Sequence, residues 1–256
     1  MEYQYCPGTK RLPGIFVLVG KNWRKIDLPH FQLFTSFLNG IAKSSNCLIQ
    51  FSYFCQNLMK MGKQNWKPGN MVYPLPAALI SCGDINGKMN LLTVSWLGTL
   101  CTDPPMCYIS VRPERYSHDM IKQSGEFVIN LTTSDIARAT DWCGVKSGRD
   151  FDKFKESGLT PAAATIVKCP IVAEAPISIE CKVKEIKSLG SHDLFIADVV
   201  NIIADDRYID SVTGAFNLDA SGIMTYSHGT YYSLGKRIGK FGWSVMKEKT
   251  KLRTKR

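Results

Sequence analysis

The sequence lacks the short motifs by which many nucleotide-binding, metal-binding and hydrolytic proteins are recognised. It contains no G-x-G-x-x-G or G-x4-G-K-[ST] run, no G-x-S-x-G elbow and no H-E-x-x-H pair. Its nine cysteines include no pair at C-x2-C spacing, and its four histidines stand far apart along the chain. These absences disfavour a local metal cluster, a thioredoxin-like redox motif and a glycine-rich phosphate loop.

Long apolar runs are also missing. No stretch approaches the roughly 20 apolar residues that a membrane-spanning helix needs, and the N-terminus does not have the layout of a secretory signal. An odd number of cysteines without such a signal favours reduced thiols. We therefore expect a cytoplasmic protein that makes no membrane contact.

Charge is plentiful but unevenly placed. The chain of 256 residues has a formal net charge of +10, and 45% of its residues are hydrophobic, as in ordinary globular proteins. Residues 1–60 carry +5, residues 61–235 carry −3 and residues 236–256 carry +8. A basic protein invites nucleic acid as a partner, but here only the two ends are basic.

Composition and hydrophobic periodicity divide the chain into three parts. Residues 1–65 show no sustained apolar period and are expected to form a poorly ordered N-terminal extension. Residues 66–233 have the alternation of a β-rich domain with short helices. Residues 234–256 form a basic C-terminal tail.

Six strands are predicted within the middle part, with short helices between them. The alternation is clearest in the hairpin formed by the last two strands, which turns near Gly190. Ser117 is expected to cap a helix that ends at Gly125, and a second helix is expected to end at Trp142 with Gly144 beyond it. The expected strands are residues 77–82, 91–97, 106–111, 127–131, 177–187 and 194–203.

Two segments carry side chains suited to ligand binding. Thr93 and Ser95 stand two residues apart on a strand, so their hydroxyls share one face and suit a flat polar heterocycle or a phosphate. Arg112 and Arg115 precede Ser117 where a strand leads into a helix, an arrangement suited to phosphate. Taken alone, the same residues fit an amphipathic strand wetted by solvent and an ordinary helix cap with solvated arginines. His192 is expected to begin a strand directly after a turn, where a lone histidine is more often a solvent-exposed turn residue than a ligand-binding one.

The order of these segments resembles the flavin reductase-like, flavoredoxin-type family of FMN-binding split barrels. The resemblance covers roughly residues 67–233 and lies in several segments that follow the family's order. They are WKPGNMVYPLP at 66–76, NLLTVSW at 90–96 with TDPPM at 102–106, SVRPERYS at 110–117, GEFVINL at 125–131 and GSHDLFIADV at 190–199. This resemblance implies a mainly β fold, a six-stranded antiparallel Greek-key split β-barrel with short inserted helices.

The same resemblance implies a homodimer that holds FMN noncovalently. NAD(P)H would reduce the flavin, or the protein would pass electrons to an electron-transfer protein. Thr93, Ser95 and Trp96 would then line the isoalloxazine, and Arg112, Tyr116 and Ser117 would lie toward the phosphate. Asn130 and His192 would be further contacts, with His192 the weak catalytic candidate. The remaining cofactor-binding residues implied are Asn90, Val94 and Ser110.

Two rival hypotheses remain. The basic tail, with Phe241 and Trp243 among its lysines, fits a nucleic-acid-binding β-barrel. The second rival hypothesis is a barrel that binds haem or another flat cofactor and catalyses no reaction. Against the first, the body of the chain is mildly acidic and shows no basic–aromatic stripe.

Overall fold

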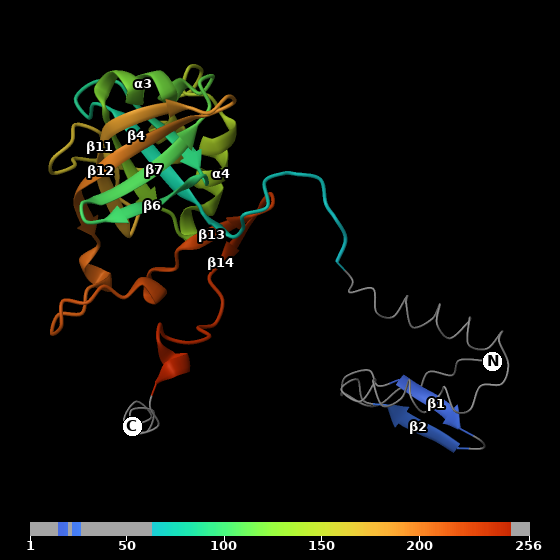
Figure 1. Ribbon diagram of the computed structural model, residues 1–256. Helices are drawn as coiled ribbons and strands as arrows, with labels where there is room; N and C mark the ends of the chain where they lie inside the picture. Colours follow the sequence, from blue (N-terminus) through green and yellow to red (C-terminus); the bar gives the residue numbers. More distant parts are fainter. Residues whose placement is uncertain (1–14, 20–21, 27–62, 247–256) are drawn as a thin grey trace. The chain divides into compact units, whose positions relative to one another are not determined.

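The computed structural model describes residues 15–19, 22–26 and 63–246. The chain divides into two units, residues 1–69 and 70–256, which are taken separately. In the first unit, β1 (Ile15–Val19) pairs with β2 (Asn22–Ile26) as an antiparallel hairpin (Figure 1). Most of the expected extension over residues 1–65 and the last ten residues of the basic tail lie outside the described residues, so the predicted domain boundaries stay a prediction.

The second unit is built on a seven-stranded antiparallel sheet. Its strand order is β5-β4-β8-β11-β12-β7-β6, and every neighbouring pair is antiparallel (Figure 1). This arrangement confirms the predicted mainly β fold with few helices. The strands are β4 (Ala78–Gly83), β5 (Met89–Val94), β6 (Leu97–Thr102), β7 (Pro105–Val111), β8 (Glu126–Leu131), β11 (Ile177–Ser188) and β12 (Asp193–Ala204).

The sheet has one strand more than the six predicted, and the additional strand is β6. Leu97 is buried, but Thr99 and Leu100 are exposed, so β6 shows almost none of the apolar alternation by which strands are recognised. Ser95 and Trp96 connect β5 to β6, and these consecutive strands are the two edges of the sheet.

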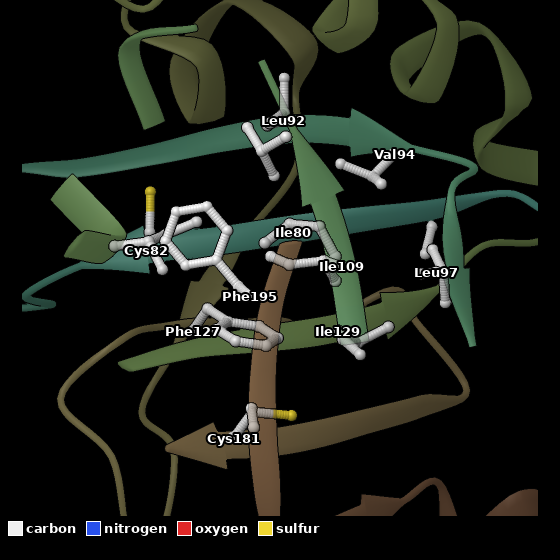
Figure 2. Packing of buried hydrophobic residues seen from close by; sticks show 14 of the residues in the cluster. Ile80, Cys82, Leu92, Val94, Leu97, Ile109, Phe127, Ile129, Cys181 and Phe195 are labelled. Carbon is white, nitrogen blue, oxygen red and sulfur yellow. The ribbon is translucent and has the colours of Figure 1, made fainter. Parts of the chain in front are cut away.

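The main cluster of buried apolar side chains in this unit comes largely from the strands of the seven-stranded sheet. Phe127 and Phe195, from β8 and β12, have no exposed surface and lie beside Ile80 and Ile109 (Figure 2). Burial of each such side chain contributes about 1.5–3 kcal/mol. The apolar cluster is therefore the main source of stability for the elements that surround it. Figure 2 also labels Cys82, Leu92, Val94, Leu97, Ile129 and Cys181.

Three short helices lie between the strands: α3 (Tyr116–Ser124), α4 (Ala137–Val145) and α5 (Lys153–Ser157). Gly125 ends α3 in the left-handed conformation, as predicted, and its N–H donates to the Ile121 carbonyl. The prediction that Ser117 caps this helix is wrong, because Arg115 is the extended cap residue and Ser117 lies in the first turn. Gly144 likewise lies within α4, not beyond its end.

Smaller elements complete the second unit. A three-stranded antiparallel sheet consists of β3 (Leu75–Pro76), β13 (Met224–Ser227) and β14 (Thr230–Ser233), and β9 (Pro161–Ala162) pairs with β10 (Ile171–Val172). In residues 63–246 all six cysteines are free thiols. The helices of the described chain are all too short or too polar to cross a membrane. Single 3-10 turns occupy Ser134–Ile136, Asp206–Tyr208, Leu218–Ser221 and Trp243–Val245.

One buried carboxylate fixes the long connection between α5 and β11. Glu180 on β11 has no exposed surface, and it accepts hydrogen bonds from the backbone N–H groups of Thr165, Ile166 and Val167. Asn201 on the neighbouring strand donates a fourth, 2.7 Å long. Burial acts to raise the Glu180 pKa, but these donors outweigh it and hold the pKa below its usual value.

Substitution of this carboxylate tests that account. Glu180→Gln replaces one acceptor oxygen by a donor facing N–H groups, so the free energy of unfolding at pH 7 should fall by about 1–3 kcal/mol. Because the folded-state pKa is depressed, the stability that Glu180 contributes is present above its unfolded pKa and is lost as pH falls through the folded pKa. Urea denaturation at several pH values should show the difference from wild type shrinking in acid. Glu185→Gln, at an exposed position of the same strand, is the control and should stay within about 0.5 kcal/mol of wild type.

Candidate functional site

A cavity of about 290 Å³ opens where three segments distant in sequence meet. The end of β7 and the start of α3 form one wall, the chain after α4 forms another, and β5 forms the floor. Its lining consists of Asn90, Leu92, Arg112, Glu114, Arg115, Tyr116, Ser117, Lys146, Ser147, Gly148, Arg149 and Lys153.

Hydrogen bonds hold the wall formed by residues 112–117 in place. The Arg115 N–H donates to the Arg112 carbonyl in a turn, and α3 begins directly afterwards. Ser117 is 1% exposed, and its hydroxyl accepts a 2.8 Å hydrogen bond from the Asn90 side-chain amide. The start of α3 is therefore attached to β5 by a contact between two buried polar side chains. The free N–H groups of the first helical turn add a partial positive charge here.

The opposite wall approaches the same asparagine through a glycine. A Cβ built on Gly148 would lie 2.2 Å from the Asn90 Oδ1 atom and 2.6 Å from its Cγ. Only a residue without a side chain can therefore bring the backbone of residues 147–149 this close to β5. The close approach makes one cavity from two loops that are some 30 residues apart in the chain.

The cavity is strongly electropositive. Five cations line it against a single carboxylate, that of Glu114. Three of the cations donate to backbone carbonyls: Arg115 to Gly144, Arg149 to Glu114 and Lys153 to Cys143. Within residues 63–246, none of the five pairs with a carboxylate. Unpaired cations that converge on one cavity attract an anion.

Lys153 is the most buried of these cations. It is 3% exposed, and its Nζ donates to the Cys143 carbonyl at the end of α4, 2.7 Å away. Burial lowers the Lys153 pKa to about 8; the Cys143 thiol opposes the decrease, and the nearby Arg115 guanidinium adds to it. An anion in the cavity would favour the charged form of this lysine.

A pair of stacked rings adjoins this cavity. The Trp96 and His192 ring centroids are 4.5 Å apart, with a 38° angle between the ring planes. The Trp96 carbonyl accepts a 2.8 Å hydrogen bond from the Ser110 N–H, so the connection between β5 and β6 is anchored to β7. Burial and then the Arg112 guanidinium lower the His192 pKa, and Glu114 opposes them. His192 is therefore neutral near pH 7, and its dependence on Arg112 and Glu114 connects the ring pair with the cavity mouth.

The structure brings together some of the residues singled out in the sequence and separates others. Asn90, Arg112, Tyr116 and Ser117 line the cavity, while Ser110, Trp96 and His192 cluster beside it. Ser95 lies half-buried in the connection next to Trp96.

Three predicted residues lie elsewhere. The Thr93 hydroxyl donates to the Thr140 carbonyl of α4, and Val94 packs in the core. Asn130 is fully buried, and its amide is used by Leu79, Ser81, Val172 and Ser178. These three do not line the cavity, and their assignment to cofactor binding stays a prediction.

Sequence reasoning missed the second wall of the cavity. The run KSGRDFDK at 146–153 was not singled out in the sequence as a binding segment. A signal was present, since three cations stand around a serine and a glycine just before a helix. Nothing local shows, however, that this run folds against residues 112–117. Arg115 was noted in its motif but was not assigned to the site.

The donor set fits a phosphate group attached to a larger molecule. A buried hydroxyl, a buried ammonium and guanidinium groups are the donors that bind phosphate with charge-assisted hydrogen bonds. Gly148 leaves open the space that a side chain would fill. The adjoining Trp96 and His192 rings supply a flat aromatic surface for a planar group.

Comparisons with known proteins identify similar domains and structures. The family model described as "Flavin reductase like domain" matches residues 71–235. An uncharacterized protein of Archaeoglobus fulgidus is 30% identical over 139 residues, which are 54% of this chain and 77% of the relative. Flavoredoxin of Desulfovibrio vulgaris is 26% identical, with a TM-score of 0.67 over 72% of this chain and all of that one. A Shewanella frigidimarina protein described as a flavin reductase with a split-barrel domain is 25% identical, with a TM-score of 0.60 over 66% of this chain and 86% of that one.

The contact between Gly148 and Asn90 generates a prediction. In Gly148→Ala the added methyl group collides with the Asn90 amide, so residues 147–149 must move away from β5. We expect the free energy of unfolding to fall by about 1–3 kcal/mol, as in other overpacked sites. Gly87→Ala is the matched control, because a Cβ there meets nothing closer than 3.8 Å. Equal denaturation midpoints for the two variants would contradict the close approach.

Proposed function

The chain belongs to the flavin reductase-like domain family, and from this membership we propose that it is an FMN-binding oxidoreductase. Two forms of the activity are compatible with the family. In one, NAD(P)H reduces the bound flavin, which passes the electrons to a small acceptor. In the other, the protein retains FMN and relays electrons to a protein partner, as a flavoredoxin-like carrier.

The electropositive cavity is the observation that carries this proposal. Ser117 and Lys153, both buried, and Arg115 would hold the FMN phosphate with charge-assisted hydrogen bonds. Arg112, at the mouth, would lie between the phosphate and the ring pair. Such bonds contribute about 1.5–3 kcal/mol each where the donor is buried, as at Ser117 and Lys153, and less at the exposed Arg112 and Arg115.

The ring pair would position the flat part of the cofactor. FMN supplies the hydride and electron chemistry when bound, and the protein's task is to bind it, orient it and exclude competing reactions. Trp96 offers an aromatic surface, and neutral His192 offers a ring nitrogen that can accept a hydrogen bond. This division of tasks explains why the cavity contains no acid–base pair of the kind that a hydrolase requires.

These observations support neither rival hypothesis, the nucleic-acid-binding barrel or the barrel that binds haem or another flat cofactor. Neither the family match nor the solved structures named above support a nucleic-acid-binding barrel. The cations of the described body gather in a cavity, not on an extended surface that would follow a nucleic-acid backbone. A haem-binding barrel could use such cations only for the haem propionates, and neither the family match nor the solved structures named above support haem as the cofactor.

Three further properties belong to the proposal. The seven-stranded sheet would form a split barrel with Greek-key connections, as in the Shewanella relative. A homodimer would cover apolar side chains that the single chain leaves exposed, Ile238, Phe241 and Val245 among them. A cytoplasmic location would suit the free thiols of residues 63–246.

An absorbance experiment tests the proposed function. The purified full chain, loaded with FMN and freed of excess by gel filtration, should retain the flavin absorption bands in the near-ultraviolet and blue. Anaerobic NADH or NADPH should bleach these bands if the protein is a reductase. Bands that persist until a separate reductase is added would identify the electron carrier. A protein that neither carries nor takes up FMN would refute both forms.

The pKa of Lys153 makes a second prediction. Because the Lys153 pKa is about 8, the free protein loses this positive charge as pH rises, while an FMN phosphate stays a dianion. The affinity for FMN should therefore fall by about tenfold between pH 7 and pH 9. Flavin fluorescence titration measures the dissociation constant at each pH.

Three variants locate that pH dependence. Lys153→Arg keeps the charge at both pH values and should bind FMN with little change between them. Lys153→Met should bind weakly throughout. Lys155→Arg, at an exposed position of the same helix, should behave as wild type. An unaltered pH dependence in Lys153→Met would rule out this lysine as its source.

A further inference from the structure

The cavity carries more positive charge than one flavin phosphate needs. Its five cations and Glu114 leave a net charge of +4. A phosphomonoester carries about −2 near neutral pH, so FMN would leave about +2 uncompensated. Exposed like charges repel one another only weakly in water, but cations held near one point still attract a further anion.

The excess charge is not spread evenly through the cavity. Ser117 and Lys153 are buried and form the inner part, against Asn90 and α3. Lys146 and Arg149, which we call the outer pair, are exposed and flank Ser147 and Gly148 on the second wall. An anion bound by the inner part leaves the outer pair free for another group.

The outer pair is held in place by contacts that leave its charge available. The Arg149 guanidinium lies 5.4 Å from the Tyr116 ring centroid and donates to the Glu114 carbonyl, 2.9 Å away. The Lys146 ammonium lies 5.4 Å from the Phe151 ring centroid. Stacking on rings and bonding to a carbonyl restrict the side chains without neutralising them. Positioned, uncompensated cations at a cavity mouth are suited to bind a phosphoryl group.

The volume of the cavity is consistent with more than a single phosphate. At about 290 Å³ it is close to the lower limit, roughly 300 Å³, of pockets that hold small organic ligands. We propose that the cavity binds a second phosphoryl group in addition to the 5′-phosphate of FMN, with Lys146 and Arg149 as its ligands. This inference rests on the proposed function and deepens it by naming the chemistry of the second ligand group.

Two molecules offer such a group. A flavin dinucleotide brings it as the second phosphate of its own pyrophosphate. A 2′-phosphorylated nicotinamide dinucleotide brings it on a separate molecule, and the outer pair would then select NADPH over NADH. The shared chemistry is a phosphoryl group next to the flavin phosphate, and binding measurements distinguish the two sources.

The first measurement needs no flavin. Calorimetric titration of the full chain with inorganic pyrophosphate and with inorganic phosphate compares two phosphoryl groups with one. Wild type should bind pyrophosphate at least tenfold more tightly than phosphate. In the double variant Lys146→Gln, Arg149→Gln this preference should fall to threefold or less. Equal affinities in wild type, or a preference that survives in the double variant, would overturn the proposal.

A matched double variant controls for net charge. Lys168→Gln with Lys187→Gln removes the same two charges from exposed positions that do not line the cavity. It should keep the full preference for pyrophosphate. Loss of the preference in this control as well would show a general effect of charge and would also overturn the proposal.

The second measurement identifies the source. A flavin dinucleotide as source requires FAD to bind at least tenfold more tightly than FMN, and a separate nucleotide requires 2′,5′-ADP to bind the FMN-loaded protein at least tenfold more tightly than 5′-AMP. Either preference should disappear in the outer-pair variant. Absence of both preferences would overturn the inference while FMN binding, if retained, leaves the proposed function intact. Failure to bind any flavin, with the pyrophosphate preference retained, would instead refute the proposed function.

Discussion

The contact of Asn90 with Ser117 on one side and Gly148 on the other is the constraint on which the candidate site depends. Its amide donates to the buried Ser117 hydroxyl, and the glycine backbone lies directly against it. A strand, a helix and a loop are joined at this one side chain. This contact holds Ser117 in the first wall of the cavity, and the second wall stands close to the first because Gly148 has no side chain. The geometry of the cavity thus follows from the packing of a neutral amide, and the charged side chains are arranged around it.

The sheet can hold this contact in place because its own buried polar side chains all have hydrogen-bond partners in the described residues. Asn130 connects β4, β8 and β11 to the chain near Val172, and Glu180 binds three successive backbone N–H groups of another connection. In the described residues, every buried side-chain nitrogen or oxygen has a hydrogen-bond partner. Unpaired groups would cost about 1–3 kcal/mol each. The buried polar residues away from the cavity therefore serve the fold. Asn130 is one of them, although the resemblance to the flavin reductase-like family implied a contact with the cofactor at this residue.

The sequence predicted those parts of the molecule that depend on local pattern. Alternation over 177–187 predicted β11 almost to its ends, and Gly125 marked the end of α3. Sequence reasoning failed where a local structure depends on residues that are distant along the chain. β6 has one buried residue at its start and looks like a loop, and Arg115 caps α3 because the preceding turn places it there. The first wall of the cavity was found because its arginines and serine are neighbours in the chain. The second wall was missed because only folding brings Lys146, Arg149 and Lys153 to the same cavity as the first wall.

A cation without a counter-charge costs folding free energy when it is buried in a cavity, and it costs little on the protein surface. Water stabilises exposed cations. Lys153, however, is almost fully buried, and its lowered pKa reflects the free energy needed to keep its ammonium group charged there. A carboxylate beside it would remove that cost, and none lies there in the described chain. A bound anion would compensate this charge. Because a ligand that binds only the folded state also stabilises it, an anion bound in this cavity would contribute to folding stability as well as to function. Its binding would couple the occupancy of the site to the stability of the two walls.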